Sequence, residues 1–202
     1  MGVEKSGSGQ RMEPESVPIK FIEELDDRKH LVLFYDDPDY ARKIEFQFIK
    51  KGLEKGEHCI YATEEDPGFI ILAMLNHGIP VKKHLKNNLL HVYQILDTKS
   101  SGLLLNAKKN FDMILADSKP PFRIVSRIVA DVSTVQGIST ELKLEHEFHK
   151  SFYDFNGTVI CPYDITKIEN DQIEQSVLRL FENHHAAIYA LKSKQGGVFY
   201  LQ

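Results

Sequence analysis

Three aspartates follow the first apolar run of the chain, at a place where nucleotide-binding proteins hold phosphate. Residues 31–35 read as a strand buried on both faces, and Asp36-Asp37-Pro38-Asp39 comes directly after them. A phosphate cradle needs glycines, so that backbone N–H groups can approach the oxygens, and usually a lysine at the helix start. This turn has neither, and its carboxylates would repel a polyphosphate. We therefore expect no P-loop ATP hydrolysis, and the simplest interpretation of Asp36 or Asp37 is a helix cap with Pro38 in the first turn.

Acidic residues also follow later strand-like runs. Asp131 comes after residues 122–130, at the place where a RecA-like ATPase keeps a metal-binding acid; a cap on the loop that follows is the structural alternative. Paired acids after a first strand are also typical of receiver domains. A receiver needs a lysine at the end of its fifth strand, whereas this strand ends in Cys161-Pro162-Tyr163-Asp164. We do not favour a receiver domain.

Histidine and glutamate cluster in the helical stretch 138–155. His146 and His149 are three residues apart, whereas the HExxH zinc motif needs a spacing of four, and no paired cysteines offer further ligands. Glu145 and His149 are four apart and would share one helix face. A solvated face that also includes Glu147 is the simpler interpretation, so we predict no metal site.

The chain carries no recognisable nucleophile. Cys59 and Cys161 fall in apolar runs and are expected to be buried and unreactive, and no G-x-S-x-G elbow is present. His184-His185 closes a predicted helix, where imidazoles interact favourably with the helix dipole. We predict no catalytic residue and no enzyme activity. Two cysteines without a disulfide framework indicate a reducing cytoplasm.

Strands alternate with helices along the chain. A short helix at 18–27 precedes strands predicted at residues 31–35, 58–63, 89–96, 122–130 and 158–162. Helices are predicted at about residues 38–56, 64–78, 101–118, 138–155 and 170–183. The runs 186–192 and 198–201 read as a terminal β-hairpin. This order predicts a three-layer α/β fold with a mostly parallel sheet, formed by one domain at 18–202 after a disordered tail at 1–17.

Ligands of such folds bind outside the carboxyl ends of the strands. Tyr35 and Tyr163 each come where a predicted strand ends, so both are expected to line this crevice. An apolar pocket with a few polar groups suits a small organic ligand. The net charge of −4 gives no reason to expect nucleic-acid binding, and no apolar run approaches the length that spans a membrane.

Several of these segments together resemble the MEDS domain, a sensory domain of methanogens and methylotrophs that includes the dichloromethane-responsive repressor. The resemblance begins with His30-Leu31-Val32-Leu33-Phe34-Tyr35 and continues through Gly52-Leu53-Glu54-Lys55-Gly56-Glu57 and the strand at 59–63. The family's later signature, an apolar strand followed by Cys-x-Tyr-Asp, is matched by Cys161, Tyr163 and Asp164. Asp131 and Glu145 match an acid after the fourth strand and a glutamate in the next helix, although Asp131 stands where glutamate is more usual.

This resemblance implies a RecA-like or KaiC-like domain that has lost its P-loop. The family is regarded as a sensory module for small hydrocarbon derivatives, attached to DNA-binding, kinase or other signalling domains. We therefore predict a non-catalytic sensory domain without a cofactor, which binds a small organic ligand at the strand ends and acts on a signalling or transcription-regulatory partner or a homo-oligomer interface. The predicted ligand-binding residues are Tyr35, Asp36, Asp37, Asp39, Asp131, Glu145, Tyr163 and Asp164.

Two alternatives remain open. One is a divergent RecA/KaiC-like nucleotide-binding protein, with weak or no ATPase activity, in which Asp131 and Glu145 hold a metal. The other is a purely structural interaction module, which a crevice filled by side chains would support. Stabilisation by ATP, GTP and Mg²⁺ separates the first from the sensory hypothesis.

Overall fold

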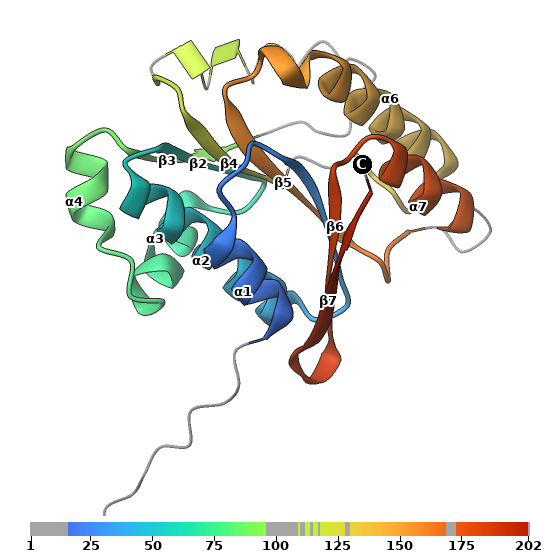
Figure 1. Ribbon diagram of the computed structural model, residues 1–202, viewed down its shortest axis with the longest axis horizontal. Helices are drawn as coiled ribbons and strands as arrows, with labels where there is room; N and C mark the ends of the chain where they lie inside the picture. The colour runs from blue at the N-terminus through green and yellow to red at the C-terminus, as the bar shows by residue number, and fades with distance from the viewer. Residues whose placement is uncertain are drawn as a thin grey trace, which may run out of the picture.

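One seven-stranded sheet forms the centre of the computed structural model, which describes residues 16–95, 118–127, 130–168 and 173–201 and isolated positions between 109 and 116 (Figure 1). The strand order is β3-β2-β4-β5-β1-β6-β7, and every neighbouring pair is parallel except the β6–β7 hairpin. The strands are β1 (His30–Tyr35), β2 (His58–Thr63), β3 (Leu90–Gln94), β4 (Phe122–Ser126), β5 (Gly157–Asp164), β6 (Ala186–Leu191) and β7 (Gln195–Tyr200).

Helices cover both faces of the sheet (Figure 1). One face packs against α1 (Val17–Glu24), α2 (Pro38–Lys55), α3 (Pro67–Asn76) and α4 (Val81–Lys86). The other packs against α6 (Val135–Ser151), the 3₁₀ helix η1 (Phe152–Asp154) and α7 (Ile173–Glu182). A second 3₁₀ helix, η3 (Lys192–Lys194), joins β6 to β7. The face that packs against α1 to α4 is called the α2 face, and the face that packs against α6, η1 and α7 is called the α6 face.

Strand β1 shows why the sheet is covered twice. All six of its residues are buried; Leu31 and Leu33 belong to the core on the α2 face, and Val32 and Phe34 to the core on the α6 face. Alternation arises because successive side chains of a strand point to opposite faces. Full burial of each such side chain contributes about 1.5–3 kcal/mol, so both helix layers hold this strand in place.

Local sequence sets both ends of α2. The Asp37 carboxylate accepts a hydrogen bond from the Tyr40 amide at 3.1 Å, and Pro38 occupies the first turn. Gly56 ends the helix with φ at +75°, a left-handed conformation that costs glycine little. The predicted cap at Asp37 and stop at Gly56 are both confirmed. The turn between β1 and α2 is thus a capped helix start.

The predicted three-layer α/β fold with a mostly parallel sheet and a terminal hairpin is confirmed. Some boundaries were wrong. β4 ends at Ser126, and β5 runs on to Asp164, so Tyr163 lies within a strand rather than after it. Helix α4 was not predicted, because its six residues are too few to show a helical period.

Part of the prediction cannot be compared with the structure. Most of the helix predicted at 101–118 and the first 15 residues of the predicted tail lie outside the described residues. At the end of that tail, Ser16 caps α1 and Val17 begins it. None of the described helices has the length and apolar character that crossing a bilayer requires.

Candidate functional site

Two of the three aspartates after β1 accept hydrogen bonds from backbone amides. While Asp37 caps α2, the Asp36 carboxylate accepts a hydrogen bond from the Lys192 amide at 2.8 Å. Asp39 is exposed in the first turn of α2. Helix N-termini attract anions because their first N–H groups are unpaired. In this chain a carboxylate already occupies that position.

Beside this turn, a buried ion pair lies on the α2 face. Glu45 of α2 is fully buried, and the Arg127 guanidinium, just after β4, donates to it from Nε at 2.9 Å and from Nη2 at 2.5 Å. The Tyr61 hydroxyl of β2 donates to the same carboxylate at 2.5 Å. Nη1 of Arg127 donates to the Tyr35 hydroxyl at 3.3 Å, and the guanidinium carbon lies 5.4 Å from the centre of that ring. We call these four residues the Glu45 cluster.

Charges within the Glu45 cluster balance. Burial alone would lower the pKa of Arg127, but the adjacent Glu45 carboxylate raises it above its usual value, so the guanidinium stays charged. Burial, followed by the charge of Glu45, raises the pKa of Tyr61, which therefore stays a neutral donor. A buried carboxylate is stable when a permanent cation and hydrogen bonds satisfy it. The Glu45 cluster meets this condition.

The α6 face carries a different polar group. Glu141 and Glu145, four residues apart on α6, are both buried and both hydrogen bond to the Tyr163 hydroxyl of β5; the Glu141 distance is 2.7 Å. A tyrosine hydroxyl has one proton, so it donates to only one carboxylate. The other carboxyl must itself be protonated and donate to the tyrosine oxygen. The geometry therefore requires one shared proton between the two glutamates.

The protonated member of this pair is Glu141. Burial and the nearby Glu145 charge raise the pKa of Glu141 to about 8. Burial also opposes ionisation of Glu145, but the hydrogen bonds that it accepts from the His30 imidazole and the Tyr163 hydroxyl lower its pKa. Glu141 Oε2 accepts a further hydrogen bond from the Ala130 amide at 2.8 Å.

Three more donor atoms surround Glu145. Its Oε2 lies 3.1 Å from Nε2 of His30, at the start of β1, and 3.6 Å from Nε2 of His184, just after α7. Cys161 of β5 places its Sγ 3.5 Å from the same His30 nitrogen. All four residues are buried, and one ligand-type atom from each lies within 4.8 Å of those of the others. We call Glu141, Tyr163 and these four residues the Glu145 cluster.

Burial changes the ionisation of the outer members of this cluster. It raises the pKa of the Cys161 thiol, an effect that the Glu145 and Glu141 carboxylates increase. Burial, with the neighbouring His30, lowers the pKa of His184 to about 3, so this imidazole is neutral at pH 7. Nδ1 of His184 lies 2.7 Å from the Leu180 carbonyl oxygen in the last turn of α7. His184 therefore contacts this helix end by a hydrogen bond from a neutral imidazole, rather than by the predicted interaction of a charged imidazole with the helix dipole.

The predicted ligand-binding residues do not form one site in the structure. Tyr163 and Glu145 meet in the Glu145 cluster, and Tyr35 belongs to the Glu45 cluster beside the Asp36–Asp39 turn. Asp131 is exposed in the loop before α6, where it accepts hydrogen bonds from the amide and the hydroxyl of Ser133. Asp164 accepts from the amide and hydroxyl of Thr166 and lies 3.3 Å from Lys167 Nζ.

Two sequence interpretations were wrong. The solvated face predicted for α6 holds for His146 and Glu147, but Glu145 is 5% exposed. Tyr163 is the penultimate residue of β5, but it is 1% exposed and so does not line a crevice. The burial predicted for Cys59 and Cys161 is confirmed.

Sequence reasoning assigned no place in a site to five residues: Glu45, Arg127, Glu141, His30 and His184. One signal was available. Ile138, Glu141, Glu145, Phe148 and Phe152 follow one another at spacings of three and four, so the two glutamates occupy apolar positions of a core-facing stripe. A carboxylate at such a position needs a buried partner. The partners lie on distant segments, which no local motif reveals.

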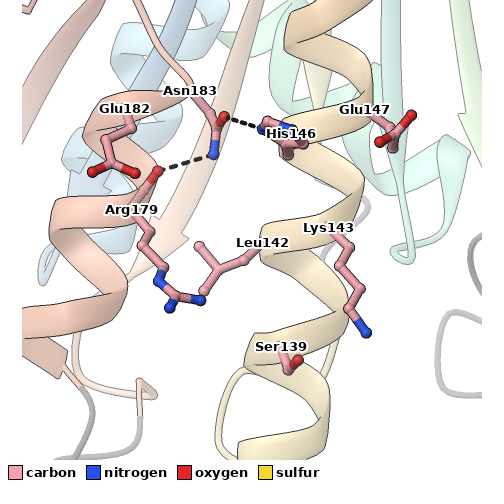
Figure 2. Close-up of a pocket in the computed structure, with 8 residues that line it drawn as sticks. All are labelled: Ser139, Leu142, Lys143, His146, Glu147, Arg179, Glu182 and Asn183. Carbon is pink, nitrogen blue, oxygen red and sulfur yellow. Dashed lines mark hydrogen bonds between the residues drawn. The ribbon is translucent and has the colours of Figure 1, made fainter.

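A groove of about 410 Å³ lies between α6 and α7 (Figure 2). His146 Nδ1 lies 3.2 Å from Asn183 Oδ1 across it, and Asn183 Nδ2 donates to the Arg179 carbonyl at 2.9 Å. Its lining residues are Ser139, Leu142, Lys143, His146, Glu147, Arg179, Glu182 and Asn183. This groove lies between the helices of the outer layer, and none of its lining residues comes from a strand end.

Comparison with known proteins identifies the family and the fold of this chain. The family description "MEthanogen/methylotroph, DcmR Sensory domain" (MEDS) matches residues 29–179. The chain belongs to the MEDS family. The match covers the Glu45 cluster and every member of the Glu145 cluster except His184, and the family resemblance inferred from the sequence is confirmed. Family membership supports a sensory or regulatory role for this MEDS domain.

A solved structure similar to this MEDS domain is that of the KaiC-like protein PH0186 from the hyperthermophilic archaeon Pyrococcus horikoshii OT3. The two share 15% sequence identity over 85% of this chain and 77% of that one, with a TM-score of 0.59. At this identity the likeness shows a shared RecA/KaiC-like fold. No curated protein is significantly similar to the MEDS chain in sequence.

Proposed function

We propose that this MEDS domain is a non-catalytic sensor that binds a small organic ligand at the carboxyl ends of β1 and β4. Tyr35 and Arg127 would contact the ligand, and the domain would then act on a signalling or transcription-regulatory partner. Free, buried cysteines fit a reducing cytoplasm as the working compartment.

The observation that carries this proposal is the capped start of α2. In a RecA-like domain the turn after the first strand is where a P-loop would hold phosphates. Here the Asp37 carboxylate accepts a hydrogen bond from the Tyr40 amide. The adjacent Asp36 carboxylate accepts one from the Lys192 amide. An incoming phosphate would meet two carboxylates instead of unpaired N–H groups. This arrangement favours a ligand other than a nucleotide.

Arg127 is the group best placed for recognition. Its side chain is 14% exposed, while the Glu45 carboxylate that anchors it is fully covered. Three of its five N–H groups bond to the described residues Glu45 and Tyr35. The remaining donors can bind an oxygen or halogen acceptor, and the Tyr35 ring beside them offers an apolar contact. A small hydrocarbon derivative with one polar group fits this combination.

Binding can be tested by a thermal-shift screen confirmed by ligand-observed NMR. The panel contains small alcohols, amines, carboxylates and halogenated methanes, and a second panel contains ATP and GTP with Mg²⁺. We expect one of the small compounds, and neither nucleotide, to raise Tm, because only a ligand that binds the folded state stabilises it. Strong stabilisation by a nucleotide would favour the alternative of a divergent nucleotide-binding protein.

A variant pair locates the site. Arg127→Lys keeps the positive charge beside Glu45 but removes the planar set of donors, so it should abolish the ligand-induced shift. The matched control is Arg42→Lys, because the Arg42 guanidinium pairs with Glu65 at 2.6 Å from the same face of the domain. Equal loss of binding in both variants, or in neither, would contradict a site at Arg127.

A further inference from the structure

Four potential metal ligands meet on the α6 face although they are far apart in sequence. They are His30 from the start of β1, Glu145 from α6, Cys161 from β5 and His184 from just beyond α7. Each comes from a different element, and each is buried. A chance cluster of charged side chains normally lies on the surface, in water. These donors are held in position by the sheet, by α6 and by the end of α7.

Three of the distances between these donor atoms are close to those of a tetrahedral metal site, and all four atoms lie within 4.8 Å of one another. In a tetrahedron with bonds of about 2.0–2.3 Å, typical of zinc with nitrogen, oxygen and sulfur, the donors lie roughly 3.3–3.8 Å apart. Nε2 of His30 lies 3.1 Å from Glu145 Oε2 and 3.5 Å from Cys161 Sγ. Nε2 of His184 lies 3.6 Å from the same Glu145 oxygen. Small adjustments would bring all four atoms to bonding distance from one centre.

The tautomer of His184 points to the same conclusion. The Leu180 carbonyl, 2.7 Å from Nδ1, can only accept a hydrogen bond, so the imidazole proton must be on Nδ1. In the neutral imidazole Nε2 then presents a lone pair, and this buried nitrogen has no hydrogen-bond partner among the described residues. It faces Glu145 Oε2, which is also an acceptor. A metal-binding histidine usually donates the N–H of its other ring nitrogen to a carboxylate, a backbone carbonyl or a water, as His184 does to Leu180.

We propose that His30, Glu145, Cys161 and His184 form a closed Zn²⁺ site. The ligand atoms are Nε2 of both histidines, Oε2 of Glu145 and Sγ of Cys161. On binding, the Cys161 thiol loses its proton to solvent, and no electron is transferred. The thiolate and the carboxylate together carry two negative charges, which the ion neutralises, so the buried site has no net charge.

Such a site would be structural. Four protein ligands complete the coordination of zinc and leave no position for substrate water. The ion would join β1 and β5 to α6 and to the end of α7, and so fix one helix layer to the sheet. This inference is independent of the small-ligand site proposed near Arg127, on the opposite face.

Metal analysis of the full chain tests the proposal. The purified protein should contain about one equivalent of zinc, and its removal by a chelator should lower Tm until Zn²⁺ is returned. Co²⁺ added to the stripped protein should produce a thiolate-to-cobalt charge-transfer band and the intense visible bands of tetrahedral cobalt. A protein that binds less than about 0.1 equivalent after incubation with Zn²⁺, and develops no such bands with Co²⁺, would overturn the proposal.

Matched variants assign the ligands. Cys161→Ser should remove the charge-transfer band, and His184→Gln should weaken Co²⁺ binding more than about 100-fold, since even loss of a supporting group costs 10–100-fold. Cys59→Ser and His84→Gln are the controls, because both residues are buried on the α2 face away from the site. They should bind Co²⁺ as the unmodified chain does. Circular dichroism of each variant confirms folding; a folded Cys161→Ser protein that keeps the band, or a Cys59→Ser protein that loses it, contradicts the assignment.

Discussion

The two faces of the sheet bury carboxylates in opposite ways. On the α2 face one glutamate, Glu45, has a permanent cation, because Arg127 donates two hydrogen bonds to it. On the α6 face two glutamates share one tyrosine hydroxyl and are surrounded by histidine and cysteine, with no lysine or arginine paired to them among the described residues. The first arrangement is electrically complete. The second is complete only when it holds a proton or a metal ion.

This difference teaches that burial alone does not define a functional group. An arginine does not lose its proton, so the Glu45 cluster has one charge state at any ordinary pH. Protons and metal ions can leave, so the charge on the Glu145 cluster depends on the surroundings. The following predictions test this contrast, beginning with the largest expected effect.

Arg127→Gln should cause the largest loss of stability. The change leaves the Glu45 carboxylate buried without its cation, which typically costs about 3–5 kcal/mol. Urea unfolding followed by circular dichroism gives the free energy of unfolding. The control is Arg42→Gln, which removes a partly exposed ion pair and should cost less than about 1 kcal/mol. Similar losses of free energy of unfolding in the two variants would show that Glu45 does not depend on Arg127 as its only buried cation.

Replacing one glutamate of each cluster by glutamine should lower the free energy of unfolding by very different amounts. Glu45→Gln removes the charge that balances Arg127 and should cost several kcal/mol, at the low end of about 3–5. Glu141→Gln should cost less than about 1 kcal/mol, because the Glu141 carboxyl must already be a hydrogen-bond donor to Tyr163, and an amide can donate in its place. Differential scanning calorimetry compares the two. A strongly destabilised Glu141→Gln protein would mean that Glu141 is ionised.

Removing a hydroxyl should affect the α6 face more than the α2 face. Tyr163→Phe leaves two buried carboxyl groups without their common partner and should cost about 1–3 kcal/mol. Tyr61→Phe takes away one of several donors to Glu45, so about 1 kcal/mol is expected. Both are measured by urea unfolding. The contrast fails if Tyr61→Phe is the more damaging change.

Removal of a helix cap should have the smallest effect on stability, and the effect should be the same on both faces of the sheet. Asp37 caps α2 and Thr134 caps α6 in the same manner, each accepting a hydrogen bond from an amide three residues on. Replacing either by alanine should cost about 1 kcal/mol. Asp37→Asn keeps the cap and should change thermal stability by only a few tenths of a kcal/mol. A gain in ATP binding by Asp37→Asn would reveal a latent phosphate site at this turn.

The fold could be predicted because its signals are local. The alternation of apolar strands with amphipathic helices fixes the α/β class, and the Asp37 cap and Gly56 stop are set by residues inside α2 itself. Helix α4 escaped prediction because a six-residue helix after Pro80 has no repeating apolar face.

The clusters could be predicted only in part because their members are distant in sequence. His30 and Cys161 are 131 positions apart, and strand pairing alone brings them together. Tyr163 and Glu145 were identified through the family resemblance, but as crevice-lining residues, whereas they lie in the core. Arg127 lies just after β4, whereas the apolar pattern extended this strand to residue 130, so the predicted boundary hid its polar role.

One short connection touches both clusters. Arg127 holds Glu45 on the α2 face, and three residues later the Ala130 amide holds Glu141 on the α6 face. A displacement of this connection would be felt on both sides of the sheet at once. Thermodynamic linkage then sets a strict condition: if a ligand at Arg127 alters the affinity of the Glu145 cluster for its ion, the ion must alter the affinity for that ligand by the same factor.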